Sequence, residues 1–163
     1  MFVPIGIRSV TQHQLLGVLT VDLKQERKRP IYPDGAPEAE LLDGEIRGTI
    51  QEDGAMVTVA LCPHLVTDLP MWLDRCATRI MDTLARLDAI KDHVAARRPD
   101  WSEAGELSIS NVEFVARLRL LGLSHYDDTM TATFNDGGLY GGHLLVVIIA
   151  KDGTLDDEIH LAG

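Results

Sequence analysis

The segment from Asn135 to His143 holds the densest set of residue types that could do chemistry. Asp136 and His143 flank a run that contains glycines at 137, 138, 141 and 142. Because glycine accepts positive φ and allows backbones to approach closely, the two side chains could meet across a tight turn. An aspartate beside a histidine can act as an acid–base pair or supply two metal ligands. One hypothesis is therefore a small hydrolase or metal-dependent module centred on Asp136 and His143.

The same segment also fits a purely structural role, which we favour. Asp136 would close an Asx-type turn, and His143 would bond a loop carbonyl as the chain enters the next strand. Two ligands are too few for a metal site, which takes three or four. We therefore expect no catalytic residue and no metal site here.

Other motifs of catalysis are absent from the sequence. There is no phosphate-binding glycine loop, no dinucleotide fingerprint, no Gly-x-Ser-x-Gly elbow and no His-Glu-x-x-His pair, so we expect no cofactor. The run from His125 to Asp128 could present one imidazole and two carboxylates, but a histidine at a helix end before a solvated acidic turn is the simpler interpretation. Cys76 falls on an apolar helix stripe, which predicts a buried free thiol of the kind found in a reducing cytoplasm.

The first 62 residues have the pattern of antiparallel strands. Residues 15–21 are rich in apolar and β-branched types, which predicts a strand, and prolines between Pro30 and Pro37 predict a loop. Residues 45–50 and 56–61 alternate around Asp53-Gly54, a turn sequence typical of a β-hairpin.

A helical period follows. Apolar residues recur every three or four positions across one long predicted helix, residues 69–97, with Thr67 or Asp68 as its cap. Arg75, Arg79 and Arg86 lie off this apolar stripe, which predicts a solvated face. Ser110 and Glu113 form a capping-box pattern, which predicts a second helix ending near Gly122.

Polar and apolar residues alternate again in residues 129–134, which predicts a strand. Residues 144–149 are apolar on both faces, as in a central strand. The order of elements predicts one α+β domain over 1–163: an antiparallel sheet with a long helix and a shorter helix packed on one face. Within it we expect strands in 1–62, helices in 67–126 and a β-hairpin module in 129–163.

The net charge of the chain indicates which class of macromolecule could bind it. The chain has 15 Lys and Arg against 25 Asp and Glu, a net charge of −10, and residues 101–163 alone hold 3 basic and 10 acidic side chains (3 − 10 = −7). Such a segment repels phosphate backbones and attracts a basic protein, so we expect no nucleic-acid partner. The candidate partner-binding residues are Asp127, Asp128, Asp136, Tyr140, His143, Asp156, Asp157 and Glu158.

Nothing at the start of the chain has the pattern of a signal peptide, and the longest apolar run, Leu144 to Ala150, is too short to span a membrane. We therefore expect a cytoplasmic protein that does not enter membranes. A structural or homo-oligomeric interaction module is a third hypothesis, and the sequence does not fix an oligomeric state.

Residues of about 65–163 resemble the bacterial domain of unknown function 2262 family. The resemblance rests on Asp100-Trp101 after the long helix, Ser110 to Phe114, the segment Asp136 to His143 before an apolar strand, and the terminal Leu161-Ala162-Gly163. The family carries no established activity. Similar small bacterial domains with such a Gly-His turn occur as immunity or antidote proteins beside toxins. The resemblance therefore implies a non-catalytic protein that neutralises a basic toxin domain by charge-steered occlusion.

Overall fold

The computed structural model describes residues 5–27, 40–64, 66–102, 105–106 and 108–163, so the predicted loop from Pro30 to Pro37 lies outside the described residues. An eight-stranded sheet follows the order β1-β2-β3-β4-β7-β8-β9-β10, and β5 and β6 form a separate two-stranded sheet. The strands are β1 Ile5–His13, β2 Gly17–Arg27, β3 Glu40–Glu52, β4 Ala55–Cys62, β5 Trp101–Ser102, β6 Gly105–Glu106, β7 Arg119–Tyr126, β8 Thr129–Asn135, β9 Leu144–Ile149 and β10 His160–Ala162.

Neighbouring strands of the large sheet are antiparallel except β4 and β7, which run parallel. The predicted β3–β4 hairpin is confirmed: Asp53 and Gly54 have φ of 50° and 76°, the mirror-image turn that matches strand twist. The predicted strand at 15–21 is confirmed in part, because β2 begins at Gly17 and β1 precedes it. The mixed α/β class with a mostly antiparallel sheet is thus confirmed.

The single long helix predicted over 69–97 is wrong, because α1 (Leu69–Ala85) and α2 (Leu87–Arg97) are separated at Arg86. At the break the Arg86 amide donates to the Thr83 carbonyl at 3.1 Å, only three residues back, which tightens the last turn of α1. The apolar period continues across the break, which is why the pattern alone predicts one helix. Asp68 caps α1, accepting from the Met71 amide at 3.0 Å, as predicted.

The second helix is shorter than predicted. α3 (Asn111–Arg117) has the capping box between Ser110 and Glu113, but the helix predicted to end near Gly122 already ends at Arg117, and residues 119–126 form strand β7. A bulge between Leu120 and Gly122 inserts one residue into this strand. The bulge shifts the buried positions from 118 and 120 to 123 and 125, which hides the two-residue period.

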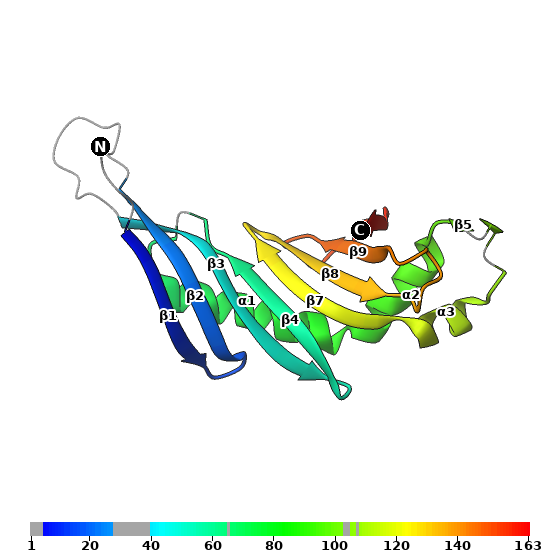
Figure 1. Ribbon diagram of the computed structural model, residues 1–163, viewed down its shortest axis with the longest axis horizontal. Helices are drawn as coiled ribbons and strands as arrows, with labels where there is room; N and C mark the ends of the chain where they lie inside the picture. Colours follow the sequence, from blue (N-terminus) through cyan, green and yellow to red (C-terminus); the bar gives the residue numbers. More distant parts are fainter. Residues whose placement is uncertain (1–4, 28–39, 65, 103–104, 107) are drawn as a thin grey trace.

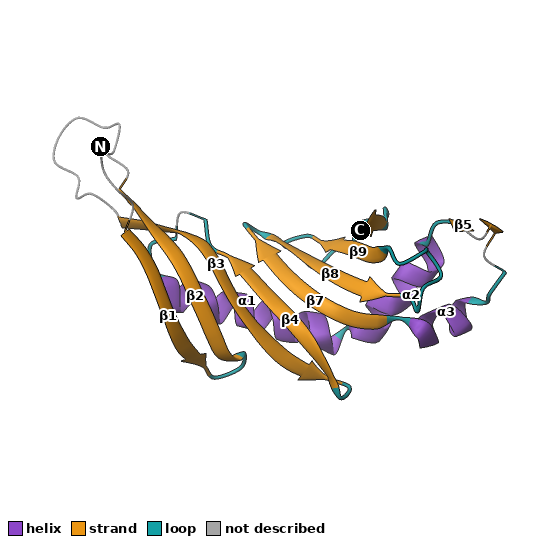
Figure 2. Ribbon diagram, viewed as in Figure 1, coloured by secondary structure: helices purple, strands orange, loops and turns teal. Residues whose placement is uncertain are grey.

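Helices and sheet share one hydrophobic core. Buried residues of α1, among them Trp72, Cys76 and Ile80, belong to the same cluster as Leu61 of β4 and Val147 of β9. Figure 1 shows α1 and α2 behind the strands, and Figure 2 shows the strands as the front layer of the same view. Cys76 is 1% exposed and free, as predicted, and burial raises the pKa of its thiol to about 12. Within the described residues, no helix has the length and hydropathy needed to cross a membrane.

Candidate functional site

The glycine-rich segment between β8 and β9 folds around the Asp136 carboxylate. Oδ1 accepts from the amides of Gly138 at 2.8 Å and Leu139 at 3.2 Å, and Oδ2 accepts from the amide of Tyr140 at 2.9 Å. Gly137, Gly138, Gly141 and Gly142 all have positive φ, which lets the amides turn inward. Asp136 is 1% exposed, so its carboxylate holds the loop together, as the structural interpretation predicted.

Two residues predicted to contact a partner are therefore buried, and that prediction is wrong for them. Tyr140 is 1% exposed, its hydroxyl donates to the Pro99 carbonyl at 2.6 Å, and its ring meets Phe114 edge-on at 6.4 Å. Burial raises the pKa of this phenol to about 12. Asp136 is enclosed in the same loop. His143 is half-buried, and its amide donates to the Tyr140 carbonyl at 3.1 Å.

Two arginines of the helical region, predicted to be solvated, instead donate hydrogen bonds to backbone carbonyls of the segment between β9 and β10. Arg79 donates to the carbonyls of Asp128 at 2.9 Å and Ala150 at 3.1 Å, and Arg86 donates to the Gly153 carbonyl at 3.1 Å. Further along α2, the His93 ring donates to the Asp156 carbonyl at 2.7 Å. Positions 79, 86 and 93 are seven residues apart, so they fall on one side of the two helices.

Two of the acidic side chains in residues 101–163 form ion pairs. Asp157 accepts from Arg97 at 2.6 Å, and Asp128 pairs with Lys151 at 2.9 Å, which lowers the pKa of Asp128. Asp127, Asp156 and Glu158 are exposed and form no ion pair with Lys or Arg in the part of the chain that the structure describes. The acidic surface is therefore smaller than the sequence predicts.

An open cleft of about 500 Å³ lies where the two parallel strands end. Cys62 at the end of β4 pairs with Tyr126 at the end of β7, so the residues that follow both strands converge there. The start of α1 forms another wall. The lining residues are His64, Val66, Thr67, Asp68, Met71, Trp72, Arg75, Asp127 and Asp128.

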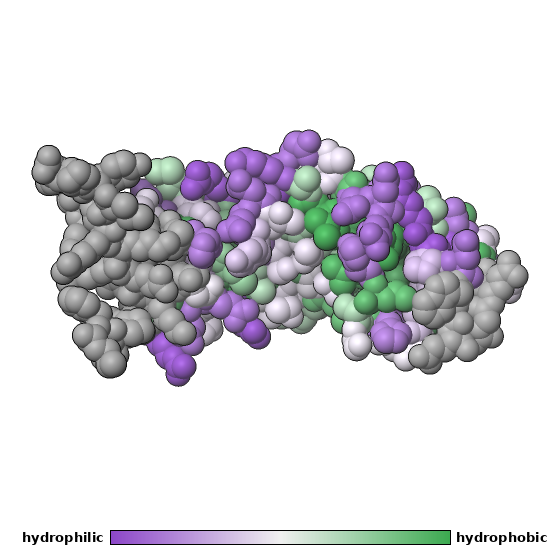
Figure 3. Space-filling view, turned by 90° about the horizontal axis from the view of Figure 1, so that it is seen from above, coloured by the Kyte–Doolittle hydropathy of each residue, from purple (hydrophilic) through white to green (hydrophobic). Residues whose placement is uncertain are grey.

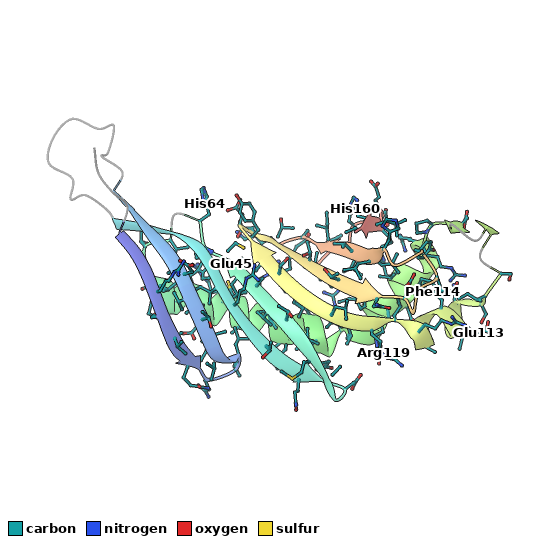
Figure 4. The ribbon with its side chains drawn as sticks, in the orientation of Figure 1. Glu45, His64, Glu113, Phe114, Arg119 and His160 are labelled. Atoms are coloured by element: carbon teal, nitrogen blue, oxygen red, sulfur yellow. The ribbon has the colours of Figure 1, made fainter. Side chains whose placement is uncertain are left out.

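The cleft combines carboxylates with exposed apolar and aromatic groups. Of the lining residues, Met71 is 54% exposed. Tyr126 lies just outside the lining, is 59% exposed and stacks its ring on that of His64 with centroids 6.4 Å apart. Figure 4 shows His64 projecting beyond the end of β4. Figure 3 looks onto this edge and shows hydrophilic side chains over it, next to a hydrophobic area over β9. Exposed aromatic and methionine side chains beside charges are typical of protein-binding surfaces.

His125 lies behind the cleft, in β7 rather than at the predicted helix end. It is 4% exposed, with its ring edge-on to Trp72 at 5.8 Å and its Nε2 3.0 Å from Nη1 of Arg79. Because a guanidinium only donates, Nε2 accepts and the neutral ring carries its proton on Nδ1. Burial lowers the pKa of His125, Arg79 lowers it further, and Asp128 and Asp127 partly offset this.

We expect the ring of His125 to stay neutral at pH values where an ordinary histidine is half protonated, near 6.5. The native state then binds fewer protons than the unfolded chain just below that pH. The contribution of His125 to stability therefore falls as the pH drops towards its folded pKa. A pH titration of the histidine ring signals by NMR measures this, with His125→Gln to assign the signal and the urea-unfolded chain as reference. A native midpoint at or above that of the unfolded chain would contradict the assignment.

The cleft was missed from the sequence because its residues lie on segments far apart along the chain. The only signal was the run from His125 to Asp128, which was assigned to a helix end. Among the described residues, no group of three or more His, Cys, Asp or Glu side chains is placed to hold a metal ion.

Comparisons of the chain with family models, with curated proteins and with solved structures gave no match, so the resemblance of residues 65–163 stays a prediction.

Proposed function

We propose that this chain is a non-catalytic binding protein that docks a basic protein segment on the edge where β4 and β7 end. The observation that supports this most is the open cleft. Asp68, Asp127 and Asp128 line it together with Trp72, Met71 and the cationic Arg75. Asp128 is already paired with Lys151 and Asp68 caps α1, which leaves Asp127 as the main charged contact. A carboxylate-lined cleft with apolar walls suits an arginine or lysine side chain, whose aliphatic part packs while its charge pairs.

The partner class follows from the net charge of −10, which favours a cationic surface and speeds its approach. A toxin domain with a basic active face is such a partner, and covering that face would block access of its substrate. The proposed contacts are those of the cleft, with Asp127 at their centre. Asp156 and Glu158 add negative charge beyond it.

The hydrolase hypothesis centred on Asp136 and His143 gains no comparable support. Both oxygens of the Asp136 carboxylate accept amides of its own loop, and the side chain is buried. A carboxylate engaged in this way is poorly placed to exchange protons with a substrate.

A fluorescent hexa-arginine peptide tests the chemistry of the cleft. We expect fluorescence anisotropy to show binding that weakens steeply with added salt, and NMR shifts of the labelled protein to concentrate on residues 64–75 and 126–128. Asp127→Asn should weaken binding about threefold, because one exposed charge contributes at most about 1 kcal/mol.

Asp53→Asn is a matched control. Asp53 and Asp127 are both exposed turn residues with φ near 50°, and asparagine tolerates this conformation. Asp53 lies in the β3–β4 hairpin, so its replacement should leave binding unchanged. Equal effects of the two variants, or shifts spread evenly over the surface, would contradict the proposed site. A partner co-purified at low salt must then show the same loss with Asp127→Asn.

A further inference from the structure

The two edges of the large sheet are unequal. At one edge β10 is three residues long, from His160 to Ala162. At the other, β1 runs for nine residues, from Ile5 to His13, and no described strand pairs with its outer side. Short edge strands resist further pairing, whereas a long edge offers a row of free backbone donors and acceptors.

The β1 edge lacks the features that usually block strand addition. Its register with β2 is continuous from Ile5 opposite Gln25 to His13 opposite Gly17, so no bulge twists it away. It contains no proline. Its one Lys or Arg, Arg8, lies 3.3 Å from Asp22 on the neighbouring strand. Val10 is 70% exposed in the middle of the strand.

We propose that β1 pairs antiparallel with β1 of a second copy about a two-fold axis at Val10, joining two sheets edge to edge. The axis places Val10 opposite its counterpart, so this exposed apolar side chain gains a cross-strand apolar partner. Ser9 then faces Thr11 of the second copy, and Arg8 faces Gln12. The two Arg8 side chains are four residues apart along the joined strands, about 14 Å, which exceeds the screening length at physiological salt.

Charge favours a second copy at this edge over the basic partner proposed for the cleft. Between Arg8 and Leu23 the only Lys, Arg, Asp or Glu residues are Arg8 and Asp22, a sum of zero in a chain of net charge −10. Beyond these strands, Asp74 of α1 reaches the same edge and lies 3.1 Å from Nε2 of His13. Two copies therefore meet at β1 with little repulsion, and the edge has no cluster of carboxylates to attract a cationic protein.

The helix-facing side of β1 offers further apolar contact. A cavity of about 340 Å³ lies along this strand, between it and the start of α1. Val21, Leu23, Leu69, Pro70 and Leu73 supply its apolar lining. Side chains on the helix-facing side of an added strand would fall beside this cavity, which extends the contact beyond backbone hydrogen bonds. The cleft is lined by other residues, so the pairing leaves it open.

Sedimentation equilibrium of the full chain tests the proposal. We expect a concentration-dependent mass approaching twice the 17.9 kDa of one chain. Val10→Lys should abolish the dimer, because the axis brings the two lysines together at the edge. Val18→Lys is the matched control: Val18 is also exposed, at 59%, but belongs to β2 and should leave the dimer intact. Circular dichroism verifies that both variants fold.

Cross-linking tests the register independently. Val10→Cys should give a disulfide-linked dimer on mild oxidation of the native protein, whereas Val18→Cys should not. A wild-type chain that stays monomeric at all concentrations would overturn the proposal, including the case in which β1 receives a strand of a different protein. A dimer that survives Val10→Lys, or fails to cross-link at position 10, would overturn it as well. Hexa-arginine binding by Val10→Lys, expected unchanged, separates this result from the proposed function.

Discussion

Arg79→Ala should lower the free energy of unfolding by about 3–4 kcal/mol, because it removes a charged donor that serves three acceptors at once. Its guanidinium lies 3.0 Å from Nε2 of His125 and donates to the carbonyls of Asp128 and Ala150. Without it the buried imidazole nitrogen loses its partner. The two carbonyls also lose the contact that fixes the β7–β8 turn and the chain after β9 against α1.

Urea denaturation followed by circular dichroism measures this loss. Arg75→Ala, one turn earlier on the exposed face of α1, is the control and should change stability by no more than about 0.5 kcal/mol. Arg79→Lys should recover only part of the loss, because an ammonium cannot span three acceptors in a plane. If Arg79→Ala were as stable as Arg75→Ala, Arg79 would not have the central role assigned to it.

Asp136→Ala should destabilise the protein by about 3 kcal/mol, since three loop amides lose their acceptor and at least one of them is buried. Asp136→Asn keeps one acceptor oxygen but turns an NH₂ group towards an amide, so an intermediate loss is expected. Loss of the Asp136 carboxylate would also free Tyr140, whose hydroxyl donates a hydrogen bond to the Pro99 carbonyl. The loss therefore extends to the contact between this loop and the end of α2.

The neighbouring Asn135 supplies the control. Its side chain accepts one amide, that of Gly137 at 2.7 Å, but it is exposed. Asn135→Ala should therefore cost about 1 kcal/mol or less. Urea denaturation compares the three variants under the same conditions. Equal losses for Asp136→Ala and Asn135→Ala would show that the buried carboxylate does not organise the loop.

Local patterns predicted the elements whose signals are local. The Asp53-Gly54 hairpin, the Asp68 cap and the Ser110–Glu113 capping box each depend on residues within four positions of one another. Strand β7 was missed because its bulge disguises a two-residue period as a helical one. The break at Arg86 was missed because the apolar positions recur at helical spacing on both sides of it.

The candidate site was less accessible from sequence for a different reason. The sequence shows that residues 101–163 are acidic. It does not show that an arginine of α2 forms an ion pair with one of these residues, since Arg97 and Asp157 are 60 positions apart. Tyr140 looked exposed because it stands among glycines, yet those glycines let the loop fold its ring inward. The cleft depends on the β4–β7 pairing, which joins residues more than sixty positions apart.

That one parallel step divides the large sheet into two meanders, β1 to β4 and β7 to β10, each built from strands adjacent in the chain. Contacts inside each meander close only short loops. The β4–β7 pairing between the meanders must instead close the long helical crossover, so forming this pair costs more chain entropy than forming a hairpin. The cleft lies at one end of the β4–β7 pair. A partner bound there would contact residues of both meanders, so its binding would raise the free energy needed to separate them.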